Sequence, residues 1–117
     1  MHFNRKNVKE LFLDAILFSL GIIATSFLYE NNLLLTVALI ILWCFGIYFW
    51  HKKRDIILFV SGAIFGPLAE TVAVYFGVWS YANPTFLGIP IWLPLVWGMA
   101  IVMIVRFAEL FIKIEKK

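Results

Sequence analysis

Glu70 is the residue of this sequence best placed to carry chemistry, because it is an acid within a long apolar run. The apolar run begins at Ile56, directly after a basic segment, and Glu70 comes fourteen residues later. At about 1.5 Å per helical residue, Glu70 would lie roughly 21 Å along a helix, past the midplane of a hydrocarbon layer of about 30 Å. An ionisable group at such depth usually faces a bundle interior or a wet cavity. We expect Glu70 to act as a proton donor; the alternative is a packing hydrogen bond.

Small residues next to Glu70 indicate which face of the helix meets its neighbours. Gly62, Gly66 and Glu70 recur at four-residue spacing, which places them on one face and lets another helix approach closely. Pro67 has no backbone N–H to donate, so a bend is expected just before Glu70. Glu70 is therefore expected to point at other helices rather than at lipid.

The stretch 77–98 that follows is uncharged and rich in aromatic residues, prolines and glycines. Aromatic rings at a membrane boundary often form an interfacial belt, which is one interpretation of Trp79 and Tyr81. The stretch is nevertheless unusually apolar for a loop, and it is expected to fold back over Glu70, with ring faces that stabilise a cation. The predicted ligand pocket consists of Gly66, Pro67, Trp79, Tyr81, Asn83, Trp92 and Trp97.

The remaining ionisable residues favour structural roles. Arg106 and Glu109 are three residues apart, so they lie on one helix face and are predicted to form an ion pair. Asp14 is expected near the basic rim, in reach of water or a lysine. His2 and His51 have no second ligand at metal-binding spacing, so no metal site is predicted, and no sequence motif for a cofactor is present.

Four apolar runs, at about 11–29, 33–50, 56–76 and 89–112, must position these residues. The chain of 117 residues is 63% hydrophobic and 15% charged, too apolar to be hidden in one small soluble core. The runs are continuous rather than alternating, which favours helices over a barrel. The sequence therefore predicts an all-α fold: one integral membrane domain, 1–117, built as a four-helix transmembrane bundle. This composition excludes a nucleic-acid binder.

The basic residues predict the orientation of the bundle. Nine of the ten lie before the first run, between the second and third, or after the fourth. Positively charged loops stay in the cytoplasm, so both termini are predicted to be cytoplasmic and the chain to lie in the plasma membrane. The net charge of +3 reflects this bias and an attraction to anionic lipid head groups.

Residues 70–95 resemble the membrane-embedded lycopene cyclase domain. After the acid Glu70 come GVWSY at 77–81, LGI at 87–89 and LPL at 93–95. The pieces 76–81 and 88–90 are also similar to the membrane carotenoid hydratases of bacteria and archaea. The resemblance implies carotenoid chemistry, in which acids protonate the end of a polyene and start ring closure. The cyclases carry an acidic pair after LPL, where this chain has Val96 and Trp97.

Three functions fit this pattern. The first is an isoprenoid- or carotenoid-type protein that binds or modifies lipid, with Glu70 as its acid. The second is a small oligomeric transporter or channel in which Glu70 relays protons or cations. The third is a structural subunit that docks a larger membrane partner. Membrane lipid is the expected surrounding, an isoprenoid the expected ligand, and a homo-oligomer the expected assembly; whether the chain is an enzyme stays open.

Overall fold

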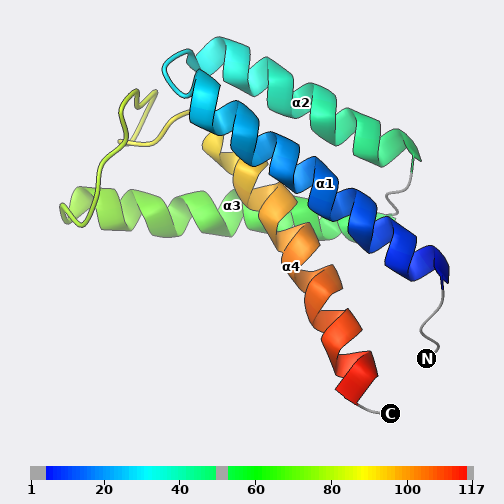
Figure 1. Ribbon diagram of the computed structural model, residues 1–117. Helices are drawn as coiled ribbons and strands as arrows, with labels where there is room; N and C mark the ends of the chain where they lie inside the picture. The colour runs from blue at the N-terminus through cyan, green and yellow to red at the C-terminus, as the bar shows by residue number, and fades with distance from the viewer. Residues whose placement is uncertain (1–4, 50–52, 116–117) are drawn as a thin grey trace.

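A computed structural model describes residues 5–49 and 53–115, which form four α-helices (Figure 1). The helices are α1 (Arg5–Leu28), α2 (Asn32–Phe49), α3 (Lys53–Tyr75) and α4 (Leu93–Glu115). The all-helical prediction is confirmed for this part of the chain. Of the residues used above, His2, His51, Lys52, Lys116 and Lys117, together with Trp50 at the end of the second predicted run, lie outside the described residues.

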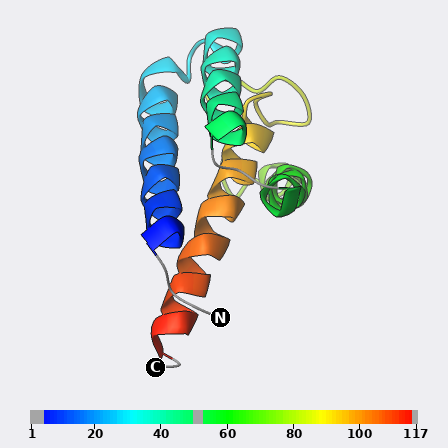
Figure 2. The same cartoon turned by 90° about the vertical axis from the view of Figure 1, so that its right-hand side faces the viewer.

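The helices are not all parallel. Helices α1 and α2 form an antiparallel hairpin, α4 packs against this hairpin, and α3 lies on the other side of α4 (Figures 1 and 2). Figure 2 shows α3 nearly end-on while α1 and α2 run along the page, so α3 crosses them at a wide angle. The first turn of α1 and the last turn of α4 lie at the same end of the molecule, and the loop 76–92 lies at the other (Figure 1).

Within the described residues, three segments are long and apolar enough to cross a membrane: Val8–Leu28, Lys53–Tyr75 and Leu93–Ile112. The apolar part of α2, Asn32–Tyr48, is shorter. A helix needs about 20 residues to cross a hydrocarbon core without distortion. The second predicted span, 33–50, is thus present as the helix α2, which is the shortest of the four described helices.

The helix ends differ from the apolar runs because local hydrogen bonds decide them. Helix α2 begins after Asn31, whose Oδ1 accepts a hydrogen bond from the backbone N–H of Leu34 at 3.1 Å, the geometry of an N-cap. Helix α4 begins at Leu93 rather than at the predicted Ile89, because Ile89 pairs with Phe86 in a short hairpin. Pro94 then occupies the first turn of α4, where a missing N–H costs least.

The apolar core lies between the α1–α2 hairpin, the end of the loop and α4. Its buried side chains are Leu17, Leu35, Leu39, Trp43, Ile89, Trp92, Leu93, Met99 and Val102. Helix α3 packs against this core through Leu58, Phe59 and Val74 and runs along α4. The ring of Phe59 stacks on Trp43 with centroids 4.2 Å apart. The core therefore fixes α4 and the loop in place, and α4 in turn holds α3.

Candidate functional site

The carboxyl group of Glu70 is held between two donors from different parts of the chain. The hydroxyl of Tyr81 donates a hydrogen bond to Oε1 at 2.5 Å, and the indole N–H of Trp97 donates to Oε2 at 2.8 Å. Glu70 itself is half-buried in the last turns of α3. Both carboxyl oxygens accept, so the group joins α3 to the loop and to α4.

Trp97 reaches Glu70 because glycines on α3 let α4 come close. A Cβ placed on Gly66 would lie 2.2 Å from Cδ2 of Trp97, so the indole ring rests directly on the glycine. One turn earlier, a Cβ on Gly62 would lie 2.7 Å from the backbone oxygen of Trp97. On the opposite helix, Gly98 packs against the ring of Phe59 in the same way. The close helix approach expected from the spacing of small residues is therefore present.

Tyr81 reaches Glu70 because the chain reverses sharply at the end of α3. Gly77 has φ +78°, and the N–H groups of Gly77 and Val78 donate to the carbonyls of Val74 at 3.0 Å and Ala73 at 2.9 Å. These are the paired hydrogen bonds of a Schellman cap, in which a glycine takes the left-handed conformation. Helix α3 thus continues through Pro67 and stops at Tyr75, and the loop turns back toward the bundle.

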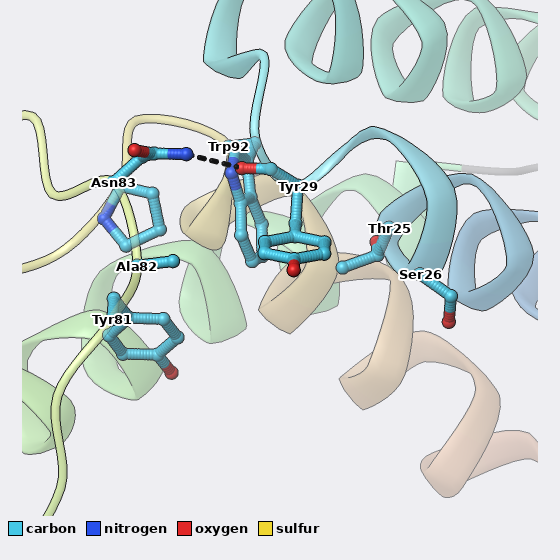
Figure 3. Close-up of a pocket in the computed structure, with 8 residues that line it drawn as sticks. Thr25, Ser26, Tyr29, Tyr81, Ala82, Asn83 and Trp92 are labelled. Carbon is cyan, nitrogen blue, oxygen red and sulfur yellow. Dashed lines mark hydrogen bonds between the residues drawn. The ribbon is translucent and has the colours of Figure 1, made fainter.

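A pocket of about 460 Å³ opens beside Tyr81, between the loop and the end of α1 (Figure 3). Its lining residues are Thr25, Ser26, Tyr29, Tyr81, Ala82, Asn83, Pro90 and Trp92. Figure 3 shows the rings of Tyr29 and Tyr81 on opposite sides of this space. The volume lies within the usual range for small-molecule sites, about 300–1,000 Å³. Glu70 does not line it; Tyr81 lies between the acid and the pocket.

Hydrogen bonds tie the loop side of the pocket to the α1–α2 turn. Asn83 donates through Nδ2 to the backbone oxygen of Tyr29 at 3.2 Å. Asn32 donates to the backbone oxygen of Asn83 at 2.7 Å and accepts from the indole N–H of Trp92 at 3.2 Å. The first of these bonds joins the loop to the α1–α2 turn (dashed in Figure 3), and the other two join the loop to the start of α2. The pocket walls are therefore held in place by hydrogen bonds within the protein.

The electrostatic surroundings of Tyr81 keep its hydroxyl protonated. Burial is the largest cause that raises the pKa of Tyr81 well above its ordinary value, and the hydrogen bond to Glu70 and the negative charge of that residue raise it further. All three effects disfavour a phenolate. Tyr81 therefore remains a neutral hydroxyl group across the physiological range.

The structure divides the seven residues of the predicted pocket into three groups. Tyr81, Asn83 and Trp92 line the observed pocket, whereas Gly66, Pro67 and Trp97 lie in the contact between α3 and α4. Trp79 is 46% exposed and does not line the pocket. Sequence reasoning missed the wall formed by the end of α1 and the following turn: Thr25, Ser26 and Tyr29. Its signal is a group of hydroxyl residues at the end of an apolar run.

A second polar cluster, the Arg106 cluster, lies at the opposite end of α3. Its guanidinium contacts three carboxylates: Glu10 at 3.2 Å, Asp14 at 2.9 Å, and Asp55. The side chains are 11% exposed for Arg106 and 9% or less for the acids. The cluster joins α1, α3 and α4 through one planar group that can bind several acceptors at once.

Two predictions about these charges were wrong. Arg106 does not pair with Glu109; instead Glu109 binds Arg54 at 2.7 Å. Asp14 is buried and bound to Arg106 rather than anchored at a wet rim. Tertiary contact with α1 and α3 offers Arg106 more acceptors than its own helix does. The missed signal is the four-residue spacing of Glu10 and Asp14, which puts both acids on one face of α1.

Comparison with known proteins returns no match for this chain, whether with family models, curated proteins or solved structures. The resemblance of residues 70–95 to the lycopene cyclases and carotenoid hydratases therefore stays a prediction. What the chain does has to follow from its own helices, from Glu70 and from the adjoining pocket.

Proposed function

We propose that this chain is a multi-pass integral membrane protein that binds or modifies an isoprenoid-type lipid, with Glu70 as its buried acid. The membrane part is supported by the outer surface of the helices. Large apolar side chains are exposed along all four of them, among them Phe27 at 82%, Phe65 at 70% and Phe111 at 61%. Soluble monomers rarely expose continuous apolar patches of this kind, whereas lipid solvates them.

We propose an orientation with both termini in the cytoplasm, in the plasma membrane. The start of α1 and the end of α4 lie together, away from the loop 76–92 (Figure 1); the first turns of α1 carry Arg5, Lys6 and Lys9, and the last turn of α4 carries Lys113. The loop carries no Lys or Arg, as expected of a translocated segment. A reporter that is active only in the cytoplasm, fused after Lys117, should be active, and fused at Asn83 it should be inactive; the reverse result would overturn this orientation.

The observation that carries the lipid function is the pairing of Glu70 with an apolar aromatic pocket through Tyr81. Once Glu70 has taken up a proton, chemistry on a double bond can proceed through Tyr81: the hydroxyl of Tyr81 gives its proton to the double bond and takes one from Glu70, and ring faces stabilise the resulting cation. Trp97 occupies the place where the cyclases carry an acid, and it binds Glu70. Support for a carotenoid or related isoprenoid comes from this arrangement together with the resemblance of residues 70–95.

The test is mass spectrometry of lipid extracts from a lycopene-accumulating bacterial host that expresses the chain. Glu70→Gln keeps the size of the side chain but removes the acid. Glu109→Gln is the matched control, because Glu109 lies at the far end of α4 in an ion pair with Arg54. We expect a new pigment mass with the wild type and with Glu109→Gln, and its loss with Glu70→Gln. An unchanged profile with well-expressed wild type, or a pigment that persists in Glu70→Gln, would refute the proposal.

A further inference from the structure

The polar groups of the pocket wall have mostly used their hydrogen-bond donors within the protein. The hydroxyl of Thr25 donates to the carbonyl of Gly21 at 2.8 Å, and that of Ser26 to the carbonyl of Ile22 at 2.9 Å. Tyr81 donates to Glu70. The indole N–H of Trp92 and one amide N–H of Asn83 are also bound within the protein. Each hydroxyl oxygen keeps lone pairs that can accept.

A wall of this kind selects the chemistry of its ligand. Phosphate and carboxylate groups need donors or cations, and none of the eight lining residues in the described chain is charged. The carboxyl group of Glu70 lies directly behind Tyr81 and would repel an anion further. The pocket is therefore poorly suited to lipid phosphates and fatty acids, and well suited to a ligand that donates a hydrogen bond.

A ligand that donates a hydrogen bond in this pocket suits it better with a hydroxyl group than with an ammonium group. Both oxygens of Glu70 are already bound, by Tyr81 and Trp97, so an ammonium ion in the pocket would lose its water without direct contact to a carboxylate. Burial of a charge without such a partner is costly. A neutral alcohol carries no charge to desolvate, and its apolar remainder fits against the rings of Tyr29 and Trp92.

We propose that the pocket binds the hydroxyl-bearing end of a neutral lipid alcohol, whose O–H donates to the hydroxyl oxygen of Tyr81. Glu70, which accepts the hydrogen bond donated by the Tyr81 hydroxyl, polarises the oxygen of that hydroxyl and makes it a stronger acceptor. A cavity of about 460 Å³ holds the end of such a molecule and leaves its chain in the membrane. This inference rests on the proposed lipid function and adds to it the class of ligand and the residue that contacts it.

The test compares three ligands that share one chain: geranylgeraniol, its methyl ether and its phosphate. Binding is measured by native mass spectrometry to the full chain in nanodiscs of zwitterionic lipid. The ether keeps the oxygen but loses the donor. We expect the alcohol to bind roughly tenfold more tightly than the ether, as the loss of one hydrogen bond predicts, and the phosphate to bind most weakly. Equal binding of alcohol and ether, or tightest binding of the phosphate, would overturn the inference while leaving lipid binding intact.

Two matched variants locate the contact. Tyr81→Phe should lower the affinity for the alcohol to that of the ether and leave ether binding unchanged, which also shows that the variant is folded. Tyr29→Phe, on the opposite side of the pocket, should keep the preference for the alcohol. If Tyr29→Phe alone abolishes the preference, the contact is not Tyr81 and the inference is wrong. If wild type binds none of the three ligands, the proposed lipid function fails and the inference fails with it.

Discussion

The contact between Gly66 and Trp97 allows a sharp test of how the site is held together. In Gly66→Ala the new methyl group would lie 2.2 Å from Cδ2 of Trp97, 2.3 Å from Cγ and 2.6 Å from Cε3. These atoms belong to a rigid ring and cannot yield as the end of a flexible side chain can. The indole must move off the helix, and the hydrogen bond from its N–H to Glu70, 2.8 Å long, is lost.

The magnitude follows from three effects. Overpacking in a close contact costs about 1–3 kcal/mol, and the loss of a hydrogen bond to a carboxylate costs roughly 1.5–3 kcal/mol. Alanine in place of glycine within a helix returns about 1 kcal/mol at most. Gly66→Ala should therefore lower the free energy of unfolding by about 1.5–5 kcal/mol when these ranges are combined.

Gly21→Ala is the matched control, since Gly21 is also a buried glycine within a helix. A Cβ at Gly21 would lie 3.4 Å from Cε of Met99 and 3.6 Å from Cδ2 of Leu39, which are ordinary contacts with flexible side chains. This variant should be neutral or more stable by up to about 1 kcal/mol. Equilibrium unfolding in mixed detergent micelles measures both. Stabilities of the two variants within about 0.5 kcal/mol of each other would refute the steric argument, because the propensity effect is common to both.

Three further predictions concern the Arg106 cluster, Tyr81 and the loop. Arg106→Met removes the guanidinium shared by three buried carboxylates and should lower the free energy of unfolding by about 3–5 kcal/mol. Arg54→Met breaks an ion pair whose arginine side chain is 56% exposed and should lower it by under about 1 kcal/mol. Equal losses for the two variants, measured by unfolding in detergent, would contradict this assignment. The pKa of Tyr81 is raised in the folded protein. The stabilising effect of the Tyr81 hydroxyl is therefore complete below the ordinary tyrosine pKa of about 10 and should be lost as pH rises above that value, since the unfolded chain then releases a proton that the folded chain keeps. The unfolding midpoints of wild type and Tyr81→Phe should converge at alkaline pH, and a constant difference between them would refute this. Leu87 has φ +52°, so Leu87→Gly should stabilise the protein by about 1 kcal/mol. Gly88 has φ +80°, and a Cβ on it would lie 2.5 Å from Val74, so Gly88→Ala should destabilise the protein. Thermal unfolding tests both: the reasoning is wrong if the two variants shift the unfolding temperature in the same direction.

The helical character of the chain could be predicted from its sequence because it depends on composition and run length. Continuous apolar stretches of this length favour helices wherever backbone groups lack water, and four helices are present in the described residues. The predicted ends of the helices were less accurate than the prediction that the chain is helical. The fourth helix starts four residues later than predicted, because Ile89 pairs with Phe86 before the helix begins; such local pairing is weakly encoded in hydropathy.

The face of the helix that carries Glu70 and the small residues could also be predicted from spacing alone. Gly62, Gly66 and Glu70 share a face because the helix repeats every 3.6 residues, and α4 packs on that face. The donors to Glu70 were among the predicted pocket residues, but their roles were not: Tyr81 lies between the acid and the pocket, and Trp97 belongs to the helix contact.

Contacts between residues distant in the sequence required the folded chain. Arg106 takes its partners from α1 and α3, 51 and 96 residues away for Asp55 and Glu10, although Glu109 is the nearer acid in the sequence. The pocket likewise needs Thr25 of α1 and Tyr29 of the following turn, which lie opposite loop residues more than 50 positions later in the sequence. Periodicity reports which residues share a face of one helix. Which faces meet depends on how closely the backbones can approach, and here the glycines at the crossing of α3 and α4 decide it.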